Sequence, residues 1–237
     1  MAAEAEAVEL LAAAPDEETL EAWLGRREKG EPLAWITEKT LFCGRPLYVS
    51  PGVYVPRKQT EELARRAGHL LPDDGWAVDL CTGTGAVAAH LQQAVPGATV
   101  VAVDIDRRAA ACARRNRVPA FVGDLAAPLH GDRRFDVVTA VAPYVPTEAL
   151  GLLPADVQRY EPRRALDGGA GGLEVVRRVI AAAGRLLRPG GWLLVEIGGE
   201  QDSALAPPLA AHGFTALTRW WDDDGDLRGV AAQVVPF

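Results

Sequence analysis

Cysteine is scarce in this chain, with only Cys43, Cys81 and Cys112 among 237 residues. An odd number of cysteines excludes a fully paired disulfide framework, and their spacing matches no metal site. Unpaired cysteines are typical of a reducing compartment. We therefore expect a cytoplasmic protein that holds no metal ion.

Long hydrophobic runs and an excess of positive charge are also missing. No apolar segment reaches the roughly 20 residues of a membrane-spanning helix, and the start M-A-A-E-A-E-A lacks the basic residues of a secretory signal. The formal net charge of −7 argues against a partner gripped through nucleic-acid phosphates. We expect neither a membrane nor a nucleic acid as partner.

Short apolar runs alternate with helical patterns from Trp76 onward. This alternation predicts an α/β fold whose mostly parallel sheet is covered on both faces, and the tail predicts a hairpin that adds an antiparallel closing strand. Gly190-Gly191 is expected to end the last long helix before the closing strands. The expected strands lie near 76–80, 99–104, 119–123, 135–141, 192–197, 215–221 and 229–235, and the helices near 85–94, 106–116, 172–187 and 201–211.

The chain before this main part is divided by its turn residues. Helices are expected over 5–14 and 17–27, separated by Pro15, and a β-hairpin region over 40–49 and 52–55. A further helix is expected from Pro56 to Leu71. We predict a short helical region at 1–38, a hairpin linker at 39–56 and the main α/β domain at 57–237.

A glycine-rich turn after the first expected strand of the main domain carries the clearest functional pattern. Asp79 ends that strand, Gly83 and Gly85 allow a tight turn at a helix N-terminus, and Asp104 ends the next strand about 20 residues on. The turn lacks the third glycine of a dinucleotide site and the lysine of a P-loop. Two acids in this register resemble the S-adenosylmethionine (SAM) site of Rossmann-like methyltransferases. The alternative is an ordinary strand-to-helix turn, in which Asp104 caps the following helix.

A second motif follows the expected strand 135–141. The segment Val141-Ala142-Pro143-Tyr144 lies where Rossmann-like folds bind substrate, at the carboxyl edge of the sheet. With G-E-P-L-A-W-I, V-P-R-K-Q-T-E, D-L-C-T-G-T-G-A, E-P-R-R-A-L-D-G-G and P-G-G-W-L-L-V-E-I-G, it makes residues 25 to 205 resemble the HemK/PrmC family. These enzymes are protein-glutamine N5-methyltransferases that modify peptide-chain release factors.

The resemblance implies a Rossmann-like SAM-dependent methyltransferase, with SAM as the methyl donor and a release factor as the acceptor. It places the acceptor at Val141, Ala142, Pro143 and Tyr144, with Pro143 and Tyr144 as the catalytic positions. The predicted donor site comprises Asp79, Leu80, Cys81, Thr82, Gly83, Gly85, Asp104, Ile105, Asp124, Leu125 and Val141.

The chain departs from the family at one position that matters for chemistry. The family motif is N-P-P-Y, whose asparagine is implied to hold the acceptor amide, whereas this chain has Val141. The N-terminal region, which grips the release factor in the family, is also reduced to two short helices. A small-molecule acceptor, or a SAM-binding protein with little activity, therefore remains an alternative, while DNA adenine methylation conflicts with the acidic charge.

Two further groups are candidates for the acceptor side of the site. Arg57 and Thr60-Glu61 are placed to close over the site, or else form a helix cap with a solvated charge. Glu161 and Arg163 resemble a family element near the acceptor pocket, or else form a surface ion pair.

Overall fold

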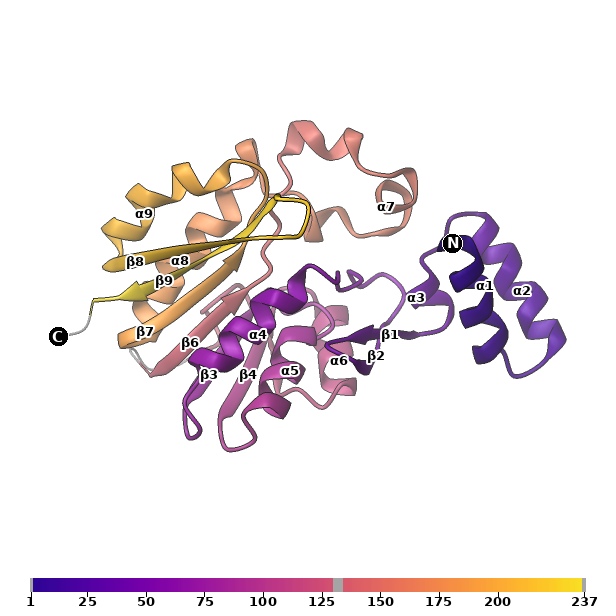
Figure 1. The fold of residues 1–237 in the computed structure, drawn as a ribbon, viewed down its shortest axis with the longest axis horizontal. Coiled ribbons are helices and arrows are strands. Elements are labelled where there is room, and N and C mark those ends of the chain that lie inside the picture. Colours follow the sequence, from indigo (N-terminus) through magenta and orange to yellow (C-terminus); the bar gives the residue numbers. More distant parts are fainter. Residues whose placement is uncertain (1, 130–133, 236–237) are drawn as a thin grey trace.

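The computed structural model describes residues 2–129 and 134–235. Within these residues, seven strands form one sheet in the order β5-β4-β3-β6-β7-β9-β8. The five strands β5, β4, β3, β6 and β7 run parallel, and β9 is antiparallel to both of its neighbours, β7 and β8. The predicted α/β class and its antiparallel closing strand are confirmed (Figure 1). The strands are β3 (Trp76–Leu80), β4 (Thr99–Asp104), β5 (Ala120–Val122), β6 (Phe135–Ala140), β7 (Leu187–Glu196), β8 (Phe214–Trp221) and β9 (Leu227–Val234).

Helices cover both faces of this sheet. The longer helices of the sheet region are α4 (Thr60–Leu70), α5 (Ala86–Ala94), α6 (Arg107–Arg115) and α8 (Glu174–Leu186), and the shorter ones are α7 (Ala155–Tyr160) and α9 (Ala206–Ala211). None of the helices in the described segments combines the length and apolarity that a bilayer span requires.

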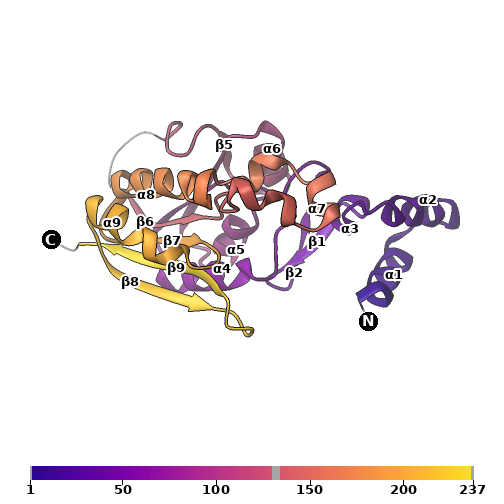
Figure 2. The same ribbon diagram turned by 90° about the horizontal axis from the view of Figure 1, so that it is seen from above.

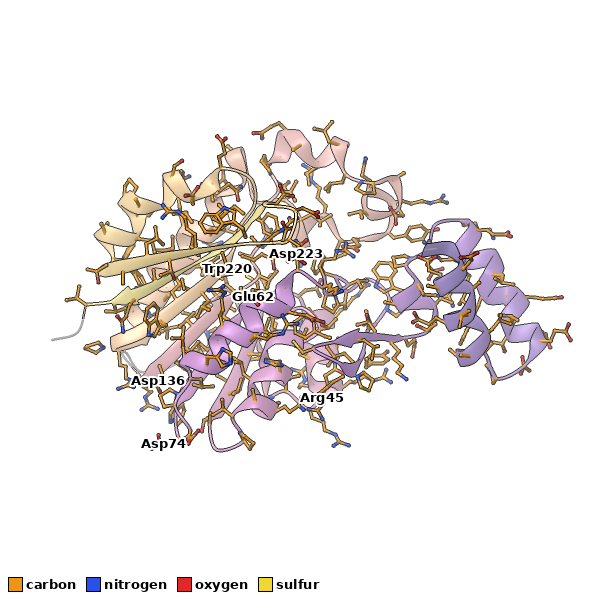
Figure 3. The ribbon with its side chains drawn as sticks, in the orientation of Figure 1. Arg45, Glu62, Asp74, Asp136, Trp220 and Asp223 are labelled. Atoms are coloured by element: carbon orange, nitrogen blue, oxygen red, sulfur yellow. The ribbon has the colours of Figure 1, made fainter. Side chains whose placement is uncertain are left out.

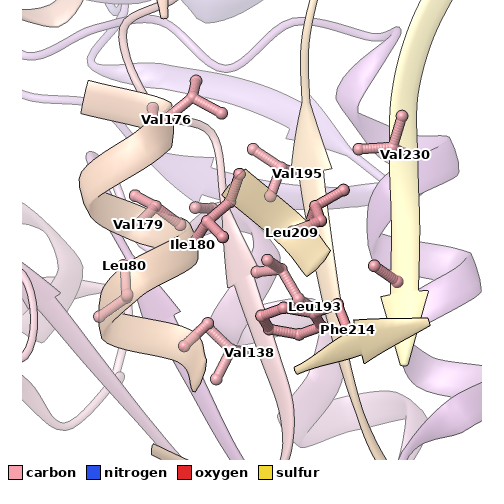
Figure 4. Close-up of a cluster of buried hydrophobic side chains, with 14 of the residues drawn as sticks. Leu80, Val138, Val176, Val179, Ile180, Leu193, Val195, Leu209, Phe214 and Val230 are labelled. Carbon is pink, nitrogen blue, oxygen red and sulfur yellow. The ribbon is translucent and has the colours of Figure 1, made fainter. Parts of the chain in front are cut away.

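The sheet separates the two largest buried clusters, as the alternation of side chains along a strand requires. Val138 and Leu193 pack with α8 on one face, whereas their chain neighbours Val137 and Leu194 pack with α4 and α5 on the other. Figure 4 shows the first cluster, in which Ile180 of α8 lies over the strands. Packing on both faces of the sheet therefore holds neighbouring strands in register, and this register fixes where their carboxyl ends meet.

The N-terminal helices α1 (Ala2–Ala13) and α2 (Glu17–Glu28) lie beyond the end of the sheet region (Figures 1 and 2). Asp16 caps α2 by accepting a hydrogen bond from the Thr19 amide at 2.8 Å. An ion pair between Arg27 and Glu6 joins the two helices at 2.8 Å, and α2 buries no residue. The short helix α3 (Leu33–Ile36) then leads toward the sheet.

Several predicted boundaries are wrong. The hairpin consists of β1 (Lys39–Phe42) and β2 (Arg45–Tyr48) with its turn at Cys43-Gly44, where φ is positive at both residues, and residues 52–55 form no strand. Helix α8 ends at Leu186, and Gly190-Gly191 lie inside β7, where Gly190 has φ +78 and the register against β6 shifts. The apolar side chains that bracket the glycines continue the strand pairing, so the glycines make a bulge and not a helix end.

The outer face of α4 is held against the closing strands by charged and aromatic side chains. Arg66 donates to Glu62 at 2.7 Å, and its guanidinium carbon lies 5.4 Å from the ring centroid of Trp220. Glu62 and Trp220 are labelled side by side in Figure 3. The contact between Arg66 and Trp220 helps to fix α4 on the sheet, with Thr60 at the beginning of the helix.

Candidate active site

A cavity opens at the carboxyl ends of β3, β4 and β6, the edge at which open α/β sheets bind ligands. It encloses about 810 Å³, counting the part open to solvent. Its walls come from the loop before α4, the glycine-rich turn, the end of β4, the segment after β6 and the segment 162–165. The lining residues are Gly52, Val53, Tyr54, Pro56, Thr60, Asp79, Cys81, Thr82, Gly83, Thr84, Ala86, Val87, Asp104, Ile105, Asp106, Ala109, Val141, Pro143, Pro162, Arg164 and Ala165.

Asp79 lies at the base of this cavity and is 1% exposed. Its two carboxylate oxygens accept hydrogen bonds from the hydroxyls of Thr82, at 2.5 Å, and Thr139, at 2.7 Å. Burial raises the pKa of Asp79 to about 6, against the opposing effect of both hydroxyls. Burying the charged form of Asp79 costs free energy, which a positively charged ammonium group next to the carboxylate would offset.

Asp104 faces Asp79 across the glycine turn and holds that turn in place. Its carboxylate accepts hydrogen bonds from the backbone amides of Gly83 and Asp106, each at 2.8 Å. The cap of α6 is Asp106, whose side chain accepts from the Arg108 amide, so the helix-cap alternative does not hold for Asp104. Each oxygen of Asp104 keeps a free lone pair, because a carboxylate oxygen accepts two hydrogen bonds.

The two glycines of the turn serve different purposes. Gly83 has φ +57, and a side chain there would extend into open space within the cavity. Gly85 has φ +81 and does not line the cavity; a Cβ atom there would lie 2.9 Å from the Cβ of Ala113. Gly83 therefore leaves room for a ligand, whereas Gly85 lets α6 pack against the turn.

The remaining predicted donor residues are divided between the cavity and the core. Cys81 and Ile105 line the cavity, and Ile105 is 57% exposed. Leu80 is fully buried in the core. Asp124 and Leu125 do not line the cavity: Asp124 pairs with Arg178 at 2.6 Å, and Leu125 packs against the core. Their contact with an adenine stays a prediction.

The segment 141–144 turns two of its four side chains into the cavity. Val141 and Pro143 line it, whereas Ala142 is buried and 1% exposed. Tyr144 is not among the lining residues, and its hydroxyl donates to Glu196 at 2.9 Å. Tyr144 therefore anchors the segment, and the role of these four residues in binding the acceptor stays a prediction.

Glu196, at the end of β7, is the residue that sequence reasoning missed. It is 1% exposed and accepts hydrogen bonds from the Thr60 hydroxyl at 2.7 Å, from Tyr144, and from the Gln59 amide at 3.3 Å. Burial raises its pKa. A glutamate that closes the apolar run Trp192–Val195 was the available signal, because a charge at that point is buried only when paired or hydrogen-bonded.

Arg57 and Glu161 form an ion pair that the sequence did not predict. Their side chains meet at 2.5 Å, and that of Glu161 is only 2% exposed, so the surface-pair alternative is wrong. Arg163 is not part of this pair and bonds Asp167 at the surface. Glu61 accepts from the Cys43 amide at 2.8 Å and thereby ties the hairpin to α4.

Comparisons with known proteins agree with this geometry. Residues 77–159 match a family model described as a methyltransferase domain. The chain is 38% identical to the release factor glutamine methyltransferase of Geobacter sulfurreducens over 217 residues, which cover 89% of this chain and 76% of that protein. The chain belongs to the release factor glutamine methyltransferase family. It is an enzyme that uses S-adenosyl-L-methionine as its methyl donor.

One further relative and one solved structure of similar fold extend the comparison. The enzyme is 38% identical over 218 residues to the ribosomal protein uL3 glutamine methyltransferase of Bradyrhizobium diazoefficiens, covering 84% of this chain and 66% of that protein. Its fold matches a T. thermophilus 16S rRNA methyltransferase, solved with AdoMet and guanosine, with a TM-score of 0.57 at 20% identity. That match covers 83% of this chain and 49% of the other.

Proposed function

We propose that the enzyme transfers a methyl group from SAM to the side-chain amide nitrogen of a glutamine in a protein, with a peptide-chain release factor as the acceptor. The observation that carries this proposal is that one cavity joins Asp79, Gly83 and Asp104 to Val141 and Pro143. The relatives named as release factor and ribosomal protein glutamine methyltransferases support a protein acceptor. They do not support the small-molecule acceptor that Val141 left open.

The residues of the cavity fit SAM as the donor. Asp79 would face the ammonium of its amino acid end, Asp104 would accept from the ribose hydroxyls, and Ile105 would cover the adenine. The open space at Gly83 leaves room for the donor to pass close to the backbone. When bound, SAM supplies an electrophilic methyl group on a sulfonium sulfur.

The acceptor side must overcome the weak nucleophilicity of an amide nitrogen, whose lone pair is delocalised. The lone pair of this amide nitrogen forms the new N–C bond, the electrons of the C–S bond return to sulfur, and one N–H proton leaves to water. The protein contributes chiefly by fixing the nitrogen in line with the methyl group and by placing hydrogen-bond acceptors on its N–H bonds. Pro143 shapes the wall of the cavity on that side.

The proposal is tested by transfer of a labelled methyl group to purified release factor, with the modified residue identified by mass spectrometry. The control is Asp104→Ala, which we expect to lower labelling at sub-saturating SAM by removing the ribose contact. Purified ribosomal protein uL3 is the second acceptor to be assayed. Labelling of neither protein, by an enzyme that binds SAM in calorimetry, would refute a glutamine acceptor on these two proteins.

A further inference from the structure

Val141 leaves the acceptor amide without a polar side chain at the position where the family has asparagine. The other polar side chains that line the cavity come from several of its walls. Asp79, Thr82, Thr84, Asp104 and Asp106 lie in the glycine turn or at the ends of β3 and β4, on the donor side, and Arg164 lies in the segment 162–165. Tyr54 lies in the loop before α4, where its ring packs against Arg57. Thr60 lies on the opposite side, where Glu196 joins it to Tyr144 and so to the segment 141–144.

The hydroxyl of Thr60 has its proton already committed. It donates to the Oε2 atom of Glu196 at 2.7 Å, and Thr60 is 3% exposed. A threonine hydroxyl has one proton and two acceptor lone pairs. Toward the cavity, Oγ1 of Thr60 is therefore a hydrogen-bond acceptor only, which suits an amide N–H and not an amide carbonyl.

The carboxylate behind Thr60 fixes this polarity. Glu196 accepts from three donors, the hydroxyls of Thr60 and Tyr144 and the amide of Gln59, and Gln59 also donates to the Tyr144 hydroxyl at 3.1 Å. Because all three donors point at one buried carboxylate, the Thr60 hydroxyl cannot turn its proton toward the cavity without losing its bond to Glu196. A hydrogen bond to a charged acceptor also polarises the hydroxyl and strengthens its oxygen as an acceptor.

We propose that Oγ1 of Thr60 accepts an N–H hydrogen bond from the acceptor's primary amide and orients its nitrogen, in the place left by the missing asparagine. Glu196 is then a positioning residue that holds Thr60 as an acceptor. This inference rests on the proposed glutamine acceptor. It further assigns the specificity of the site, because a glutamate side chain offers no N–H donor to Thr60.

The test uses the full-length enzyme with S-adenosylhomocysteine, the demethylated product of the donor. Thr60→Val keeps the shape of the side chain and removes its oxygen, whereas Thr60→Ser keeps the oxygen and is the matched control. Calorimetry measures the affinity for S-adenosylhomocysteine. It then measures the affinity of the binary complex for a release-factor fragment carrying the glutamine that becomes methylated, and for the same fragment with glutamate there. Thermal unfolding checks that each variant is folded.

We expect Thr60→Val to bind S-adenosylhomocysteine within about twofold of the wild type and to lose about 10-fold or more of the preference for glutamine over glutamate. Its kcat should fall about 10- to 100-fold, and Thr60→Ser should restore most of both. A Thr60→Val enzyme that keeps the preference refutes the inference alone. Weakened S-adenosylhomocysteine binding with the preference intact would show that Thr60 serves the donor. If the wild type binds neither fragment, the glutamine acceptor itself is wrong, and the role of Thr60 fails with it.

Discussion

Removing the charge of Asp79 should stabilise the enzyme at neutral pH while impairing its site. Burial raises the pKa of Asp79 from 3.8 to about 6, so the folded state binds this proton more tightly than the unfolded state. The stability linked to that proton is fully present below about pH 3.8 and is lost as the pH rises through about 6. About two pKa units at about 1.4 kcal/mol each give a ceiling near 3 kcal/mol at pH 7.5.

The Asp79→Asn variant realises this change without altering the size of the side chain. The asparagine oxygen can accept from one threonine hydroxyl, and its amide can donate to the other if that hydroxyl turns, so both buried partners stay paired. We expect its free energy of unfolding to exceed that of the wild type by about 1–3 kcal/mol at pH 7.5, with the difference vanishing near pH 4. Affinity for S-adenosylhomocysteine should fall, because the amino group loses its anionic partner.

Urea unfolding followed by circular dichroism at pH 4, 6 and 7.5 measures the difference, and equal m-values show that the compared states are the same. Asp74→Asn is the matched control, since Asp74 is an exposed acid in the turn before β3 (Figure 3). A variant less stable than wild type at pH 7.5, or one whose advantage does not depend on pH, would contradict the assignment of a desolvated charge to Asp79.

Three further changes separate donor, acceptor and structural roles. Asp104→Ala should weaken S-adenosylhomocysteine binding by about 2 kcal/mol, as calorimetry would show, because the ribose contact and the anchor of the Gly83 amide are both lost; unchanged affinity would remove Asp104 from the donor site. Glu196→Gln should lower kcat and abolish the acid limb of the pH–rate profile. Burial raises the pKa of Glu196, and only its ionised form accepts the hydrogen bonds of the Thr60 and Tyr144 hydroxyls. An unaltered acid limb would assign that limb to another group. Gly85→Ala should lower the free energy of unfolding by about 2 kcal/mol or more through strain at φ +81 and contact with Ala113; a variant as stable as the wild type would show that α6 can shift.

The sequence predicted the parts of the fold that periodicity determines. β3 and β4 lie at the predicted residues because a run of apolar side chains ends at an acid in each, Asp79 and Asp104. The register that brings these acids to one edge follows from parallel pairing, in which Asp79 stands opposite Ala102. Local pattern therefore sufficed to bring Asp79, the glycine turn and Asp104 to one cavity, but not to place Asp124 and Leu125 there.

The acceptor side depends on contacts between distant segments, which no local pattern encodes. Thr60 and Glu196 are 136 positions apart, and Arg57 and Glu161 are 104 apart. The short helices between 147 and 172 were not predicted, since their glycines and prolines break the periodicity on which helix prediction depends. This stretch supplies Glu161, so its burial could not be foreseen.

Burial of a carboxylate does not by itself mark a functional residue in this fold. Asp136 is 7% exposed at the opposite edge of the sheet, where it accepts from the Trp76 amide and pairs with Arg188 (Figure 3). Its charge is compensated by a cation and a backbone donor, which is sufficient for a structural role. Asp79 and Glu196 are instead held by side-chain hydroxyls and an amide, which leave their negative charge without a cation hydrogen-bonded to it among the described residues. Such a carboxylate is costly to bury, and the structure recovers that free energy only when the carboxylate meets a ligand, as we propose for Asp79, or fixes a group that does, as we propose for Glu196.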